Sequence, residues 1–196
     1  MRRAVVVLLL LIANVVFGSE NAGDARASQG ASVLQTVPGQ LLQQWLTAGM
    51  TNSGNTPNDQ RPENLAIGYT RFQGPELEPN TDTLPYRGMS AGRGEPNAAD
   101  LLRFANALRV LSREMTEFVT TGKVEEQANA GPARYAYGFG DRNADCRRYV
   151  GHNGGAPGMN AELSILWNEG YAVVVLANLD PPIAQDAAQY IADSLQ

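Results

Sequence analysis

The stretch AELSILWNEGYAVVVLANL, residues 161–179, contains two apolar runs that are separated by the turn Asn168-Glu169-Gly170. Short apolar runs bounded by turn residues predict strands, and so tight a connection predicts an antiparallel hairpin. The second run is apolar from residue 171 to residue 177. We therefore expect this strand to be covered on both of its faces.

Two further segments flank this hairpin. Residues 147–150 predict a third strand, which gives a C-terminal antiparallel three-strand meander. After Pro181-Pro182, residues 183–195 have helical spacing and predict a closing helix. Its apolar side carries Ala187, Ile191 and Leu195.

A helical pattern also precedes the meander. Asn97 is placed as an N-cap, and Asp100 lies in the first turn, where the helix dipole favours a carboxylate. The apolar stripe of this helix consists of Leu101, Phe104, Ala105, Leu108 and Leu111. Residues 40–48 predict a further short helix, and residues 65–72 a short strand. Helices on both sides of a meander predict an α+β fold with a three-layer, α/β/α-like arrangement.

The N-terminal residues have the composition of a targeting segment. Met1-Arg2-Arg3 is positively charged, and residues 4–17 are apolar apart from Asn14. This pattern is typical of a secretory signal peptide. We expect a signal peptide over residues 1–18, with cleavage as late as residue 27, a linker over 19–38 and one domain over 39–196. An exported protein, periplasmic or secreted, follows from this, and an uncleaved signal would anchor it in the membrane.

Composition excludes several classes of function. The net charge is −5 and no run of basic residues exceeds two, so we expect no nucleic-acid partner. One histidine and one cysteine cannot build the usual zinc sites, and G-x-G-x-x-G is absent. We therefore expect neither a metal nor a cofactor. Cys146 is the single cysteine, so no disulfide can form within the chain.

Gly88-Met-Ser90-Ala-Gly92 matches the G-x-S-x-G nucleophile elbow, and Asp141 or Asp145 followed by His152 would complete a triad in the order of the α/β-hydrolases. The surroundings do not fit, because a polar segment containing prolines precedes the serine and Pro96 delays the helix that should follow. Ser90 is therefore kept only as an alternative nucleophile.

The single histidine lies in GHNGGAPG, residues 151–158. This segment, together with YGFG at 137–140 and YAVVVLAN at 171–178, resembles the C-terminal part of the beta-lactamase-related serine hydrolases. Class C beta-lactamases, penicillin-binding proteins and related esterases belong to this family. Segments at 49–54 and 65–70, and Ser90-Ala-Gly92 leading into 99–104, occur in the order that the family shows. The resemblance covers roughly residues 40–196 and implies a partial beta-lactamase/transpeptidase-like fold.

The resemblance also implies a site. The third catalytic motif of the family, Lys-Thr-Gly, is often replaced by His-x-Gly, which His152-Asn153-Gly154 matches. His152 would then face the cleft, and the backbone N–H of Gly155 would form one half of an oxyanion hole. One such donor contributes roughly 2.7–4 kcal/mol to catalysis. The implied ligand is a small acyl compound, a beta-lactam or a peptide.

The nucleophile motifs of the family, Ser-x-x-Lys and Tyr-x-Asn, do not occur in this sequence. The single lysine gives only Thr120-x-x-Lys123, which lies at the wrong place in the motif order. The resemblance thus implies a relative of enzymes that hydrolyse beta-lactams, D-Ala peptides or esters, here a truncated one that is inactive alone and has an exposed sheet edge. Two alternatives stay open: an exported non-catalytic binding protein or half-site with a partner chain that completes the fold, and an esterase that uses Ser90 with His152.

Overall fold

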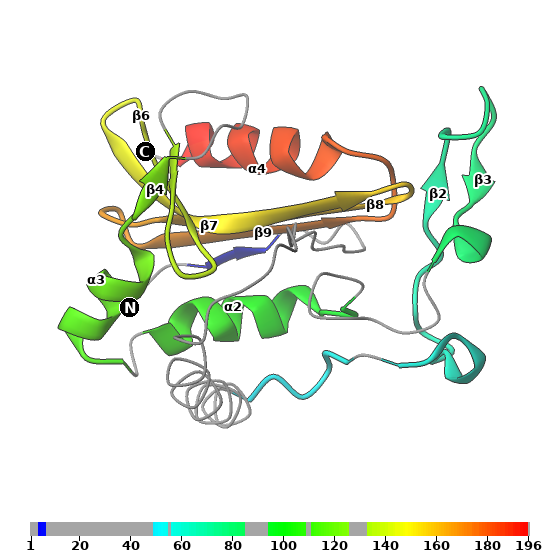
Figure 1. Ribbon diagram of the computed structural model, residues 1–196, viewed down its shortest axis with the longest axis horizontal. Coiled ribbons are helices and arrows are strands. Elements are labelled where there is room, and N and C mark those ends of the chain that lie inside the picture. Colours follow the sequence, from blue (N-terminus) through cyan, green and yellow to red (C-terminus); the bar gives the residue numbers. More distant parts are fainter. Residues whose placement is uncertain are drawn as a thin grey trace, which may run out of the picture.

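A computed structural model describes residues 4–6, 49–54, 56–84, 94–108, 111–125 and 133–195 of the chain. A seven-stranded sheet in the order β1-β9-β8-β7-β6-β5-β4 lies between helix α4 on one face and helix α2 on the other (Figure 1). Every pair of neighbours from β4 to β9 is antiparallel, and β1 runs parallel to β9. The α+β, three-layer prediction is confirmed.

The strands of the main sheet are β1 (Ala4–Val6), β4 (Val124–Glu125), β5 (Ala133–Tyr135), β6 (Gly140–Ala144), β7 (Arg147–Ala156), β8 (Met159–Leu166) and β9 (Tyr171–Ala177). A separate hairpin pairs β2 (Tyr69–Thr70) with β3 (Glu78–Pro79). The helices are α2 (Ala98–Ala107), α3 (Arg113–Thr120) and α4 (Ile183–Ser194), with short 3₁₀ turns η1 (Asn58–Gln60) and η2 (Thr81–Thr83).

The β8–β9 hairpin forms where the sequence predicts it. Leu166 pairs with Tyr171 across the turn, and Gly170 takes a φ of +76°, which favours glycine. Residues 172–177 of β9 are all buried. The prediction of a strand covered on both faces is confirmed, because alternate residues of β9 pack toward α2 and toward α4.

Strand β7 is longer than residues 147–150, since it continues through the glycine-rich segment to Ala156. Gly151 explains part of this: a Cβ there would lie 1.8 Å from the carbonyl oxygen of Leu163 on β8, so only glycine permits the pairing. Strands β4, β5 and β6 were not predicted. The polar sequence of β6, GDRNA, gives no apolar alternation to indicate a strand.

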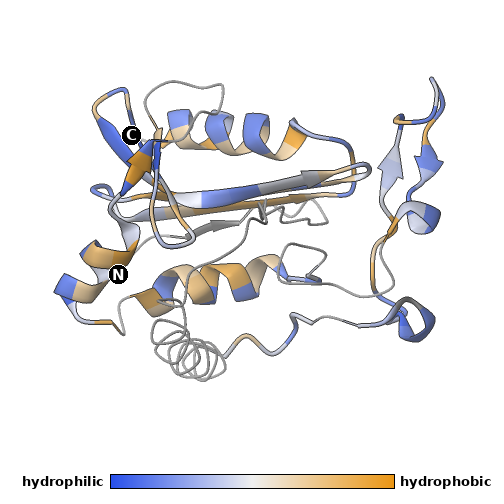
Figure 2. Cartoon of the chain, in the orientation of Figure 1, coloured by the Kyte–Doolittle hydropathy of each residue, from blue (hydrophilic) through white to orange (hydrophobic). Residues whose placement is uncertain are grey.

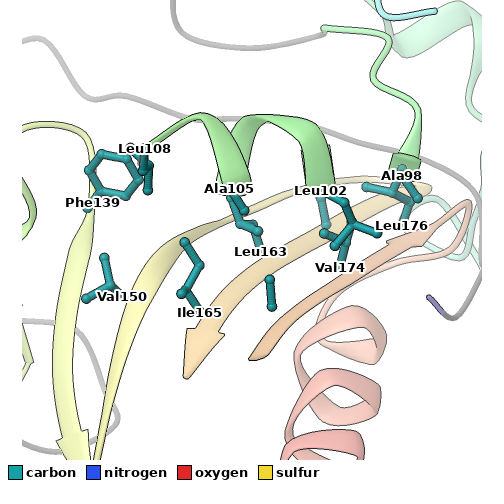
Figure 3. Close-up of a cluster of buried hydrophobic side chains, with 12 residues drawn as sticks. Ala98, Leu102, Ala105, Leu108, Phe139, Val150, Leu163, Ile165, Val174 and Leu176 are labelled. Carbon is teal, nitrogen blue, oxygen red and sulfur yellow. The ribbon is translucent and has the colours of Figure 1, made fainter. Parts of the chain in front are cut away.

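Large apolar side chains fill the space between α2 and the sheet. Figure 3 shows Leu102 and Ala105 of α2, and Leu108 at its C-cap, pointing at side chains from four segments of the sheet layer. Those side chains are Phe139, Val150, Leu163, Ile165, Val174 and Leu176. Their burial supplies much of the free energy of folding, at about 1.5–3 kcal/mol for each large side chain.

The closing helix α4 is confirmed, but its most buried residues differ from the expected ones. Ala184, Ala188 and Ala192 are buried against β8 and β9, whereas Ala187, Ile191 and Leu195 are only partly buried. Alanine on the inner face lets the helix approach the sheet closely. In Figure 2, α2 is mostly hydrophobic in colour, whereas hydrophilic residues alternate with apolar ones along α4.

Asn97 caps α2 as predicted, because its side-chain oxygen accepts a hydrogen bond from the Ala99 N–H. The helix ends at Ala107, short of Leu111.

Asp100 is fully buried and accepts hydrogen bonds from Asn52 N–H (2.7 Å) and the Ser53 hydroxyl (2.9 Å). Burial alone would raise the pKa of Asp100, but these bonds and Arg103 hold it below its ordinary value. Its role is thus to join residues 52–53 to the helix.

The predicted helix over 40–48 lies outside the described residues, and the strand over 65–72 reduces to β2. Within the predicted signal peptide, Ala4–Val6 forms β1 and pairs with Ala172–Val174 at the edge of β9. Apart from β1, the signal segment and linker are not described. Within the described ranges, no helix has the length and apolarity that a membrane span requires.

Candidate functional site

His152 lies where β7 extends past its neighbour β6. The last β6–β7 pair joins Gly140 to Gly151, so from His152 onward β7 is paired only with β8 among the described strands. One backbone edge of residues 152–156 is therefore open in this part of the chain. We call it the β7 edge.

The register determines which peptide groups point along the β7 edge. Trp167 N–H donates to Arg148 C=O (2.8 Å), and in an antiparallel pair the hydrogen-bonded positions alternate. His152 and Gly154 thus direct their backbone groups to β8. Asn153 and Gly155 direct theirs to the β7 edge. The N–H of Gly155 consequently faces outward, away from β8.

The His152 ring is held at both nitrogens. Nδ1 contacts the backbone oxygen of Asn153, and Nε2 lies 2.9 Å from the hydroxyl of Tyr135 on β5. A carbonyl oxygen only accepts, so Nδ1 carries the proton, and in the neutral ring Nε2 then accepts from the Tyr135 hydroxyl. The two rings meet edge to face at 5.8 Å. This arrangement orients the imidazole and fixes its tautomer.

Contacts with β8 and with the start of α4 hold Gly154 and Gly155 in position. The Asn160 side chain donates to Gly154 C=O (2.8 Å) and accepts from Ala184 N–H (2.7 Å). A Cβ on Gly155 would lie 2.5 Å from Cγ of Pro181, so this position also needs glycine. The end of β7 is thereby fixed to the helix layer.

Neither carboxylate that could have served His152 in a triad bonds to its ring, whose nitrogens contact Asn153 and Tyr135 instead. Asp141 accepts from the Arg148 guanidinium (2.8 Å) and from Gly122 N–H (2.9 Å). Together with Glu117, Asp141 raises the pKa of Arg148, although burial of the guanidinium acts in the opposite direction. Asp145 lies in the β6–β7 turn, at the far end of β7 from His152. Ser90 lies outside the described residues.

A cavity of about 320 Å³ opens beside His152 and Tyr135 and extends toward α4. Glu162 of β8 lines it, and burial raises the pKa of this carboxyl to about 8, although Arg142 acts to lower it. Among the described residues, no cluster of histidine, cysteine and carboxylate side chains could hold a metal ion.

Sequence reasoning missed two residues of this region. Tyr135 is 17 positions from His152 in the sequence, and only the β5–β6–β7 register brings them together. Glu162 did carry a signal, because it is the single charged residue in a run that otherwise predicts a buried strand.

Three solved structures are similar to this chain over most of its length. A penicillin-binding protein from Bacillus halodurans is 24% identical with a TM-score of 0.67, and the match covers 78% of this chain and 46% of that one. The octameric penicillin-binding protein homologue from Pyrococcus abyssi is 20% identical with a TM-score of 0.68, covering 82% and 37% of the two chains. The D-amino acid amidase from Ochrobactrum anthropi is 17% identical with a TM-score of 0.56, covering 76% and 46%. The chain thus spans less than half the length of these proteins.

These likenesses define the fold as that of the penicillin-binding proteins and their relatives. The family profile described as Beta-lactamase matches residues 22–196. The chain therefore belongs to the beta-lactamase family of serine hydrolases. A comparison with curated proteins gives no match.

Proposed function

We propose that this chain forms the oxyanion side of a beta-lactamase-family acyl-transfer site and binds a small acyl, beta-lactam or peptide ligand along the β7 edge without being acylated by it. The observation that supports this most is the outward direction of the Gly155 N–H beside an oriented His152. An extended ligand can add to such an edge through main-chain hydrogen bonds. The names of the structural neighbours, penicillin-binding protein and D-amino acid amidase, favour the same ligand classes.

The absence of acylation follows from the chemistry available in the sequence. A serine nucleophile needs an adjacent base, and this chain has neither Ser-x-x-Lys nor Tyr-x-Asn. Thr120 and Lys123 are no substitute. The Thr120 hydroxyl donates to Thr116 C=O within α3, and the Lys123 ammonium lies over the Phe118 ring at 5.0 Å. A binding protein, or a half-site that a partner chain completes, accounts for these features better than an esterase based on Ser90.

We also propose that the protein is exported and that its signal peptide is removed. Cleavage after residue 18 would remove β1 and leave Ala172–Val174 at the edge of β9 without their present partner. An open strand edge readily accepts another strand. We propose that a partner strand pairs there in the mature, exported protein, and that this is where a chain completing the fold would join.

The binding claim is tested by titrating the ¹⁵N-labelled chain with benzylpenicillin and following backbone amide resonances. We expect dose-dependent shifts of the Asn153 and Gly155 amides, with the Leu176 amide in buried β9 unchanged. His152→Ala should weaken the response, and Tyr190→Phe, at an exposed tyrosine of α4, should leave it unchanged. If the amide resonances of Asn153 and Gly155 do not shift at saturating benzylpenicillin, the proposal is wrong.

A further inference from the structure

The cavity beside His152 extends over the α4 face of the sheet, away from the β7 edge. Side chains from β6, β7, β8 and α4 surround this part, which we call the Glu162 pocket. They are Arg142, Tyr149, Glu162, Ser164, Gln185 and Gln189. At about 320 Å³, the cavity is within the range of small-ligand sites.

Three polar atoms of the Glu162 pocket are buried without a hydrogen-bond partner among the described residues: Oη of Tyr149, Oε2 of Glu162 and Oε1 of Gln185. Buried polar atoms are nearly always paired, because an unpaired one has lost the hydrogen bonds that water would give it. They come from β7, β8 and α4 and line a single cavity. Their convergence points to a ligand that supplies hydrogen-bond donors.

The two charged side chains of the pocket also lack their ordinary partners among the described residues. The Arg142 guanidinium lies over the Tyr149 ring at 4.4 Å and donates to Oε1 of Gln189 (3.2 Å), and it forms no ion pair with a described carboxylate. Oε2 of the Glu162 carboxyl receives no hydrogen bond from any described group. An arginine held by an aromatic ring and an amide keeps a fork of donors suited to a carboxylate.

We propose that the Glu162 pocket binds a small zwitterion of the size of a free amino acid. Its ammonium group is held by Glu162 and Gln185, and its carboxylate by Arg142. Each charge of such a ligand matches a group in the pocket that has no oppositely charged partner in contact among the described residues. This site goes beyond the proposed function, since it lies on the α4 face and uses neither the Gly155 N–H nor acyl chemistry.

The surroundings of Glu162 determine how binding depends on protons. The titratable groups that line the cavity are Tyr135 from β5, Asp141 and Arg142 from β6, Tyr149 and His152 from β7, and Glu162 itself. Helix α4 presents the neutral Gln185 and Gln189, the latter bound to Asp193 (2.8 Å), and Val175 is the neighbour on β9. Arg142 is thus the nearest source of positive charge. Burial still leaves Glu162 mostly protonated at neutral pH, and an arriving ammonium group would displace that proton.

The test is isothermal titration of the full chain with alanine at pH 7, in two buffers of different ionisation enthalpy. We expect binding with release of about 0.9 proton per alanine, because a carboxyl with a pKa near 8 is protonated in roughly nine of ten molecules. Alaninamide, which lacks the carboxylate, and propionate, which lacks the ammonium, should both bind more weakly. Failure of alanine to bind would overturn the proposal, and so would equal binding of the three probes.

Variants assign the binding to this pocket. Glu162→Gln keeps the shape of the side chain and should weaken alanine binding about 30-fold or more while abolishing proton release. The matched control is Glu114→Gln, at an exposed position of α3, which should bind as the wild type does. Equal affinity in Glu162→Gln and wild type, with the fold verified by circular dichroism, would contradict the assignment.

The two proposals can fail separately. Glu162→Gln should leave the benzylpenicillin-induced shifts of Gly155 in place, and His152→Ala should leave alanine binding in place. Loss of alanine binding in His152→Ala with no effect of Glu162→Gln would move the amino-acid site to the β7 edge and overturn the inference.

Discussion

The two faces of the sheet are covered in different ways. On the α2 face, large apolar side chains from helix and strands fill the space between the layers. On the α4 face, the helix contributes mainly alanine, and polar side chains of β6, β7 and β8 line a cavity of about 320 Å³. The first face provides the stability of the fold, and the second leaves buried polar groups available for a ligand. The site at the β7 edge lies where the sheet loses its neighbouring strand.

The largest effect is expected from a truncation on the α2 face. Ile165 is fully buried in that cluster, so Ile165→Ala should lower the free energy of unfolding by about 2–5 kcal/mol. Its chain neighbour Ser164, on the α4 face and at the cavity, provides the control, because Ser164→Ala removes one hydroxyl and no apolar group and should change stability by at most about 1 kcal/mol. Urea denaturation measures both. Comparable losses would mean that the two faces are packed alike.

A pH dependence of stability should distinguish the α4 face. Below about pH 4.5 the Glu162 carboxyl is neutral in both the folded and the unfolded states. Between 4.5 and about 8 the unfolded chain releases this proton while the folded chain keeps it, so stability falls as pH rises, by at most about 1.4 kcal/mol per unit. Glu162→Gln should remove that part of the decline. Parallel wild-type and variant curves in urea denaturation from pH 5 to 8 would show that Glu162 is not buried in this way.

An intermediate effect is expected at the ion pairs that border the α2 face. Asp141→Asn removes the charge that faces Arg148, while the amide side chain keeps the size of the original. We expect a loss of about 1–3 kcal/mol in stability, since a half-buried guanidinium loses its closest carboxylate. Glu114→Gln, on the exposed side of α3, is the reference. If thermal unfolding cannot separate the two variants, the Arg148–Asp141 pair does not contribute to stability.

The smallest effect on stability is expected from Tyr135→Phe, which removes one hydrogen bond to His152 and should cost about 0.5–1.5 kcal/mol. Its effect on the imidazole should be easier to detect. The ¹⁵N chemical shifts of the ring should report a mixture of tautomers where the wild type shows one. A ring spectrum that is the same in both proteins would mean that Tyr135 does not orient His152.

The sequence was sufficient for the parts of the fold with strong local patterns. The continuous apolar run of β9, the Asn-Glu-Gly turn and the N-cap at Asn97 each act over a few residues, and each was predicted. Strands β4, β5 and β6 were missed, and the β6 sequence GDRNA has no apolar alternation that would indicate a strand.

The candidate site was predictable only where one motif contained it. His152, Gly154 and Gly155 lie within four residues and were found. Tyr135 was missed because a nonlocal register places it. The direction of the Gly155 N–H also depends on the β7–β8 register. Glu162 could have been found as a charge in a buried strand, but the cavity around it involves residues from α4 that no local pattern connects to it.

The central claim, a beta-lactamase-family half-site that binds its ligand without being acylated, is tested most directly by intact mass spectrometry. The folded full chain is incubated separately with a fluorophosphonate and with benzylpenicillin, and its mass is measured under denaturing conditions. We predict no mass increase with either reagent on protein whose amide spectrum confirms that it is folded. A stoichiometric adduct that maps to one serine and is lost in Ser90→Ala would contradict the claim and establish the esterase alternative.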